Sequence, residues 1–359
     1  MKWLLTTPSL LDQGGVASYI NALLPFLSKK HEITCFELGS THNKKNILYP
    51  VTDQFRFRKL LKTEQFDALH VNPSLDLKSF IRDGFLVLQA KRSSLPVLVF
   101  WHGWGKAFEP VVEKYLLSFF RRTFARADGF IVLASAFEEK LRQWGINSPV
   151  FKITTTVHEN LLAGVDLDDK LSRLGREVET NVLFLARLER AKGVFETLDG
   201  VRLLQKKGFP VTLSIAGDGS VRQELEEYIK KLNVQDNKIR FLGYVRNQKK
   251  IEAFLSHDIY CFPTFYGEGL PTSVLEAMAF GMPVITKPVG GLADIFEDGK
   301  MGVLMHGNSP EEIADCIEKI IGDKKNMLRM GRYNIKYARK NFMASVVAAR
   351  LDKIYQAIL

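Results

Sequence analysis

Strand-like and helix-like segments alternate along almost the whole sequence, and this alternation limits the possible folds more than any other feature. A chain of this kind forms parallel sheets that are covered by helices on both faces. The expected strands are 2–6, 33–37, 68–71, 97–101, 130–133, 150–154, 181–186, 211–216, 239–242, 258–263 and 283–286. The expected helices include 16–29, 113–126, 136–144, 193–207, 221–232, 249–256, 310–322 and 344–359.

The alternation is interrupted once, in the polar segment 157–179, which we interpret as a connection between domains. A chain of 359 residues is also too long for one ordinary core. The predicted fold class is therefore α/β, with two Rossmann-like domains, 1–165 and 166–343, whose parallel sheets face each other across a cleft. Ligands of such sheets bind at the carboxyl ends of the strands, so the loops that follow strands are the candidate sites.

The composition is that of a soluble globular protein, with 46% apolar and 25% charged residues. No apolar run approaches the ~20 residues that span a bilayer, and the first residues lack a signal-peptide core. Cys35, Cys261 and Cys316 are widely spaced, which predicts small buried side chains in a reducing compartment. We therefore expect a cytoplasmic protein.

The net charge of +10 is unevenly distributed, with +7 in residues 1–160 and +3 in the remainder. Such an excess can face phosphates or an anionic membrane surface, although a solvated surface is the commoner explanation. Two segments suggest contact with the inner face of a membrane: the basic and apolar 55–62, and the helical pattern 115–126. Core packing of the apolar residues is the alternative. The apolar face of the second segment consists of Tyr115, Leu116, Phe119, Phe120, Thr123 and Phe124.

The segment 268–276 is the most informative motif, because it begins and ends with a carboxylate at a strand-to-helix transition. Glu268 is expected on a loop at a strand end, and Glu276 just inside a helix. A helix N-terminus offers free amides and a partial positive charge to a phosphate, and the two acids can bind hydroxyls of a sugar nucleotide. A purely structural alternative is a capping box in which Ser273 caps the helix and Glu276 reaches back.

Other loops that follow strands add candidate residues. Gly14 and Gly15 precede a helix and let the backbone approach a ligand, and His102 can donate to a sugar hydroxyl or help to neutralise charge. Arg187 and Lys192 are placed to neutralise a diphosphate. Each of these motifs has an ordinary structural explanation when it is taken alone.

Two further motifs argue against particular chemistries. The turn after 211–216 begins like a dinucleotide fingerprint with Gly217 and Gly219, but Arg222 stands at the last motif position, which disfavours a nicotinamide dehydrogenase. Asp166 and Asp168 imitate a metal site but lie in the polar connection, so we interpret them as solvated charge. No other cluster has metal-ligand spacing, and we expect that no metal or other cofactor is required. Clustered aromatic stacking motifs are also lacking, which disfavours binding of nucleic acid.

Taken together, these loops resemble a retaining glycosyltransferase of the GT-B fold, in glycosyltransferase family 4. The resemblance covers nearly the whole chain and rests on Gly14-Gly15, the turn at His102, Arg187 with Lys192, the turn at Gly217, and the Glu-x7-Glu element from Glu268 to Glu276. It implies a nucleotide-sugar donor, UDP-, GDP- or ADP-linked, and a glycan or lipid-linked acceptor. It also implies that the last helix, 344–359, packs back on the N-terminal domain.

The resemblance further implies a role for each candidate residue. Glu276 would bind the ribose, Glu268 the hydroxyls of the transferred sugar, and Arg187 and Lys192 the departing diphosphate. His102 would contact the donor sugar, and domain closure would complete the site. Backbone groups would hold the donor at Gly14, Gly15, Gly217, Gly269, Leu270, Pro271 and Thr272. The leaving phosphate would itself accept the acceptor's proton, with no enzymic nucleophile.

One segment departs from the family pattern, because 154–160 replaces the turn that is common at the inter-domain hinge. The resemblance therefore says least about the acceptor and about closure. Two other functions stay open from the sequence: a nucleotide-sugar epimerase of the same twin-domain fold, and a non-catalytic protein that binds nucleotides or glycans.

Overall fold

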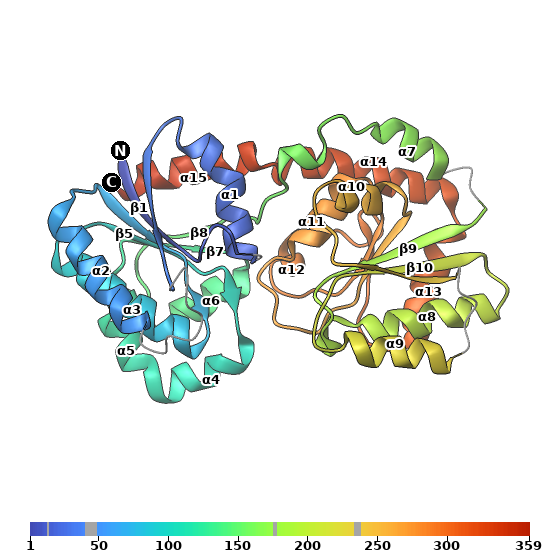
Figure 1. The fold of residues 1–359 in the computed structure, drawn as a ribbon, viewed down its shortest axis with the longest axis horizontal. Helices are drawn as coiled ribbons and strands as arrows, with labels where there is room; N and C mark the ends of the chain where they lie inside the picture. The colour runs from blue at the N-terminus through green and yellow to red at the C-terminus, as the bar shows by residue number, and fades with distance from the viewer. Residues whose placement is uncertain (13, 40–48, 175–177, 233–237) are drawn as a thin grey trace. The chain divides into compact units, whose positions relative to one another are not determined.

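The chain forms two compact units in the computed structural model, which describes residues 1–12, 14–39, 49–174, 178–232 and 238–359 (Figure 1). Unit 1 consists of Met1–Thr156, Gly267–Leu270 and Ala344–Leu359, and unit 2 of Val157–Tyr266 and Pro271–Met343. The first boundary thus falls earlier than the predicted 165. The segment Gly267–Leu270, which the sequence assigned to the second domain, groups with unit 1.

Unit 1 is built on a parallel six-stranded sheet with the order β2-β1-β3-β5-β7-β8. The inner strands are almost wholly apolar and buried, because helices cover both faces. The strands are β1 (Lys2–Thr7), β2 (Glu32–Glu37), β3 (Ala68–Val71), β5 (Val97–Phe100), β7 (Gly129–Val132) and β8 (Val150–Lys152), with a small second sheet of β4 (Ser74–Leu75) and β6 (Gly103–Trp104).

In Figure 1, α1 and α15 cover one face of this sheet, and α2, α3 and α5 cover the other. The helices of unit 1 are α1 (Gly15–Leu27), α2 (Tyr49–Thr63), α3 (Leu77–Arg92), α4 (Glu109–Val111), α5 (Leu117–Arg122), α6 (Ser135–Gln143) and α15 (Ala344–Ile358). The short turns η1 (Lys106–Phe108) and η3 (Phe124–Arg126) are 3₁₀ helices, and η2 (Val112–Leu116) is a π-helix.

Unit 2 repeats the plan with a parallel sheet of order β11-β10-β9-β12-β13-β14. Its strands are β9 (Thr180–Leu185), β10 (Val211–Ala216), β11 (Ile239–Gly243), β12 (Ile259–Phe262), β13 (Val284–Thr286) and β14 (Gly302–Leu304). Its helical segments are η4 (Glu159–Leu161), α7 (Leu167–Leu174), η5 (Arg190–Lys192), α8 (Val194–Lys206), α9 (Arg222–Lys231), α10 (Gln248–Leu255), α11 (Thr272–Ala279), α12 (Leu292–Ile295), α13 (Pro310–Ile321) and α14 (Lys324–Asn341).

The helix that the sequence predicted over 113–126 is broken into η2, α5 and η3. The wider π turn of η2 changes the angular position of the following residues, so the predicted apolar face does not persist. Tyr115 is 68% exposed, whereas Phe120 and Phe124 are fully buried. Phe120, Thr123 and Phe124 therefore contribute to the core, as the alternative interpretation held for the apolar face.

The segment 157–179 was predicted to be a polar connection, and this is wrong for α7. Leu167, Leu171 and Leu174 form a buried face of the helix. Asp166 caps its start, because its Oδ1 accepts the amides of Asp168 (3.0 Å) and Asp169 (2.9 Å). Apolar spacing within a charged segment was the signal that the sequence interpretation missed.

Polar and aromatic contacts join α15 to the sheet of unit 1. The ring of Tyr355 stacks on Trp3 with the centroids 3.8 Å apart, and its hydroxyl lies 2.7 Å from Nδ1 of His70. Asp352 lies 2.8 Å from Nε2 of His31 and also binds Lys30. The last helix thereby completes the core of unit 1, although it is far from that core in sequence.

The buried ring of His70 predicts a loss of stability in mild acid. Burial lowers the pKa of His70 to about 3, below the ~6.5 of an unfolded chain. The unfolded state therefore binds the extra proton as the pH falls from 7 to 5, and His70 alone costs roughly 2 kcal/mol over this range. Urea unfolding of wild type and H70Q at several pH values measures the free energy of unfolding. If this free energy depends equally on pH in the two proteins, the contribution assigned to His70 is wrong.

Candidate active site

Two predicted phosphate-binding cations lie between β9 and α8, at the carboxyl edge of the second sheet. The Arg187 side chain is 69% exposed and its Nη1 lies 3.2 Å from Oε1 of Glu189. Such an exposed pair stabilises little, so the guanidinium can exchange this partner for a phosphate. Nζ of Lys192 lies 4.2 Å from the ring centroid of Tyr266, a cation–π contact with the loop after β12.

The loops after β9 and β12 are attached to each other. The two strands pair in parallel, and the amide of Phe265 donates to the carbonyl of Ala191 at 3.0 Å. Gly193 has a φ of +82°, and a Cβ there would lie 2.7 Å from Cγ of Pro263. Only glycine suits this approach. Lys192 is therefore held beside the chain that leads to α11.

The start of α11 has the features of an anion site. The helix begins at Thr272 after Pro271, and within the described ranges no side chain caps it. Amides of the first helical turn have no intrahelical partner, and the helix dipole favours a negative charge there. The capping-box interpretation is wrong, because Ser273 places its Oγ 2.7 Å from the hydroxyl of Tyr260.

Glu276 stands one turn into α11 and is paired with a lysine. Its side chain is 6% exposed, and Lys250 of α10 donates from Nζ to Oε1 at 2.6 Å. A carboxylate this buried requires a partner, and the ammonium supplies the opposite charge. In the part of the chain that the structure describes, Oε2 of Glu276 accepts no hydrogen bond. That oxygen can therefore accept a ligand hydroxyl.

Gly217 has a structural explanation. Its φ is +141°, and a Cβ would lie 1.9 Å from the carbonyl oxygen of Ala186. Its amide donates to the carbonyl of Gly243 at 2.7 Å. The turn after β10 is thus packed against the loop after β9, and the amide of Gly217 is already occupied. This glycine shapes the edge of the sheet and does not offer a phosphate a free amide.

His102 follows β5 at the carboxyl edge of the first sheet, where it belongs to a buried polar chain. Its Nε2 lies 2.7 Å from Oδ1 of Asn72, which follows the neighbouring strand β3. Nδ2 of Asn72 donates to the carbonyl of Thr6 at 2.8 Å, and this contact orients the amide. The imidazole packs on Phe100, with the centroids 3.7 Å apart.

These contacts fix the protonation of His102. Burial, and secondarily the nearby His70, lower its pKa well below the ordinary value, so the ring is neutral at pH 7. Oδ1 of Asn72 can only accept, so Nε2 carries the hydrogen and Nδ1 is the acceptor. The prediction that His102 helps to neutralise charge is therefore wrong. What the ring offers a ligand is an acceptor at Nδ1.

The segment Gly267–Leu270 lies against the same edge of unit 1. A Cβ on Gly269 would lie 2.4 Å from the carbonyl oxygen of His102, and Thr155 donates from Oγ1 to the carbonyl of Leu270 at 3.2 Å. Glu268, which is partly exposed, is thereby carried on the loop that packs at His102. The structure thus brings these two predicted residues to one edge.

Gly14 and Gly15 precede α1 at this edge as well. Gly14 has an extended backbone, and a Cβ on either residue would meet no described atom within 4 Å. Neither packing nor conformation requires glycine here, which leaves open space beside the backbone. Asn72 and Lys250 are the residues that the sequence interpretation missed. Asn72 directly follows an expected strand and could have been found by the rule that found His102.

Two family models match the chain. The description of one is "Glycosyl transferases group 1", and it matches residues 170–337. The other, "Glycosyl transferase 4-like domain", matches residues 33–153. The chain belongs to glycosyltransferase family 4. The predicted family is confirmed, and the enzyme is a glycosyltransferase.

Relatives and solved structures agree with this. Spore coat protein SA of Bacillus subtilis is 23% identical over 96% of this chain and 94% of its own length. Phosphatidyl-myo-inositol mannosyltransferase of Mycobacterium leprae is 26% identical over 84% of this chain and 76% of its own length. Anabaena Alr3699/HepE, solved in complex with UDP and glucose, has a TM-score of 0.74 at 18% identity and covers 99% of both chains. The predicted GT-B fold class is confirmed.

Among the residues that the structure describes, no group of three or more His, Cys, Asp or Glu side chains of the glycosyltransferase is arranged to hold a metal ion. No described helix has the length and apolar character to cross a membrane.

We expect the neutral state of His102 to depend on Asn72. In N72D a carboxylate replaces the amide beside Nε2 and favours the charged ring, so the pKa of His102 rises. Long-range ¹H–¹⁵N NMR between pH 5 and 8, with H102Q to identify the signals, reports the charge directly. The His102 ring of the wild type should stay neutral with its hydrogen on Nε2 over this range, whereas the His102 ring of N72D should titrate. A wild-type His102 that titrates near 6.5 would contradict the geometry.

Proposed function

We propose that the enzyme transfers a sugar from a nucleotide sugar to a glycan or lipid-linked acceptor in cell-surface polysaccharide biosynthesis, with retention at the anomeric carbon. The relatives support this class of reaction. A capsular polysaccharide biosynthesis glycosyltransferase, CapM of Staphylococcus aureus, is 24% identical over 49% of this chain. The structural neighbour Alr3699/HepE was solved with UDP and with UDP-glucose.

The observation that carries the proposal is the uncapped start of α11 with the buried Glu276 one turn behind it. The amides of Thr272 and Ser273 would bind the diphosphate, and Oε2 of Glu276 a ribose hydroxyl. Lys192 and Arg187 would stabilise the charge that develops on the diphosphate as the glycosidic bond breaks. Because two cations supply this charge, the proposed reaction requires no metal.

Glu268 and His102 would act on the transferred sugar. Glu268 would accept hydrogen bonds from hydroxyls of the sugar, and Nδ1 of the neutral His102 would accept one more hydrogen bond. Gly14, Gly15 and Gly269 would leave space for substrate beside the backbone. The leaving phosphate would take the proton from the acceptor hydroxyl, so positioning and charge stabilisation supply the catalysis. Lipid-linked acceptors would be met in the cytoplasm at the inner face of the membrane.

A thermal-shift panel of UDP-, GDP-, ADP- and dTDP-sugars tests the proposal. The true donor at ~100 times its Kd should stabilise the fold by about 2.7 kcal/mol. E276A should lose this shift, whereas E268A and K192A should keep much of it and lose turnover. NMR of the product then shows the anomeric configuration. The proposal fails if no nucleotide sugar shifts the melting temperature, and an epimerised sugar without transfer would identify an epimerase.

We expect Lys250 to position Glu276 for the ribose. K250M removes the partner of the carboxylate and should raise the Kd of the bound nucleoside diphosphate roughly 10- to 100-fold. K249M is the matched control, because Lys249 is an exposed neighbour on the same helix. Calorimetry should also show that K250M loses most of its preference for the diphosphate over its 2′,3′-dideoxy analogue. An equal loss for both ligands would mean that Lys250 is only structural.

A further inference from the structure

We propose that the groove between α2 and α3 of unit 1 binds anionic phospholipid headgroups and docks this unit on a lipid surface. The groove has a volume of about 620 Å³. Arg58 and Lys62 of α2 and Arg92 of α3 line it together with Phe55 and Phe85. Among the residues that the structure describes, no acidic group lines it.

The charges of the groove differ from those around it. Neighbouring cations have carboxylate partners: Arg56 binds Asp53 at 2.9 Å, and Arg82 binds Asp83 at 2.7 Å. Within the described residues, no ion pair is formed by the three cations that line the groove. All three are exposed. Unpaired cations that converge on a groove attract an anion, and phosphate is the group that Arg binds best.

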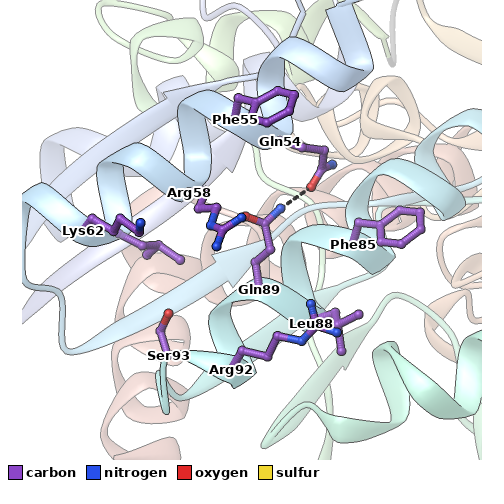
Figure 2. A pocket seen from close by; sticks show the side chains of 10 residues that line it. Gln54, Phe55, Arg58, Lys62, Phe85, Leu88, Gln89, Arg92 and Ser93 are labelled. Carbon is purple, nitrogen blue, oxygen red and sulfur yellow. Dashed lines mark hydrogen bonds between the residues drawn. The ribbon is translucent and has the colours of Figure 1, made fainter.

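The apolar groups of the groove are unusually exposed. Phe55 is 69% exposed and Phe85 is 45% exposed, whereas Phe57 of α2 is fully buried in the core. Figure 2 shows both exposed rings on one side of the groove, with Lys62 and Ser93 on the opposite side. Exposed aromatic rings beside unpaired cations match the acyl–headgroup boundary of a bilayer, where each finds a suitable partner.

The groove is preformed and lies away from the reaction site. Nε2 of Gln89 donates to Oε1 of Gln54 at 2.6 Å, which joins the two helices at the groove (Figure 2). Arg92 ends α3 just before β5 begins at Val97, so the basic end is at the amino edge of the sheet. His102 is at the carboxyl edge, beyond the end of the same strand. The groove is therefore separate from the residues proposed for transfer.

Vesicle co-sedimentation of the full chain tests this proposal. We expect binding to vesicles that contain about one third phosphatidylglycerol, and little binding to pure phosphatidylcholine. R58Q/K62Q/R92Q should weaken partition more than tenfold, since each cation near an anionic surface contributes about fivefold. The matched control K206Q/K230Q/K325Q removes three exposed lysines of unit 2 and should change partition far less. F55S/F85S should also weaken binding.

Three results would overturn the proposal. Equal losses in the groove variant and the lysine control would show nonspecific attraction to charge. Displacement by inorganic phosphate at constant ionic strength, with F55S/F85S binding as wild type does, would show a site for a soluble anion. Failure of wild type to bind anionic vesicles would exclude lipid docking outright. Turnover of a soluble acceptor should be unchanged in R58Q/K62Q/R92Q, so this test is independent of the proposed reaction.

Discussion

Parallel pairing of neighbouring strands is the constraint on which the candidate residues of each unit depend. In a parallel sheet every strand ends at the same edge, so loops from distant parts of the chain become neighbours. Pairing of β12 with β9 brings Phe265 to Ala191, and with it Tyr266 to Lys192. Pairing of β3 with β5 places Asn72 beside His102. Each contact follows from strand order, which the sequence pattern does not contain.

This explains which features could be predicted. The strands were predictable because short apolar segments alternate with helical ones, and the α/β class and the candidate loops followed from them. The family was suggested by the resemblance of the motifs in those loops. The tautomer of His102 was not predictable, because it is set by Asn72, which follows another strand. The capping box failed for the same reason: Lys250, on a separate helix, takes the carboxylate of Glu276. Local patterns therefore located the residues, and long-range contacts determined their chemistry.

The glycines separate into two physical classes that a sequence motif treats alike. Gly217 and Gly193 are required by close backbone approach and by positive φ, so they are explained without a ligand. Gly14 and Gly15 have neither constraint in the described part of the chain, where the space beside them is open. A glycine that nothing in the fold requires is the better indication of a substrate contact. The turn at Gly217 and the Gly14-Gly15 turn thus carry different weight for function.

The two segments that the sequence suggested for membrane contact are distinguished by the direction of their aromatic rings. The ring centroid of Phe124 lies 4.9 Å from that of Trp101, and the ring centroid of Phe120 lies 5.2 Å from that of Trp144. These rings of α5 and η3 therefore pack in the core. In α2 the helical period divides the rings, with Phe57 inside and Phe55 outside. The outward ring and the unpaired Arg58 and Lys62 share one face. Apolar surface that the core does not use, next to charge that no described carboxylate neutralises, is what an interfacial helix needs.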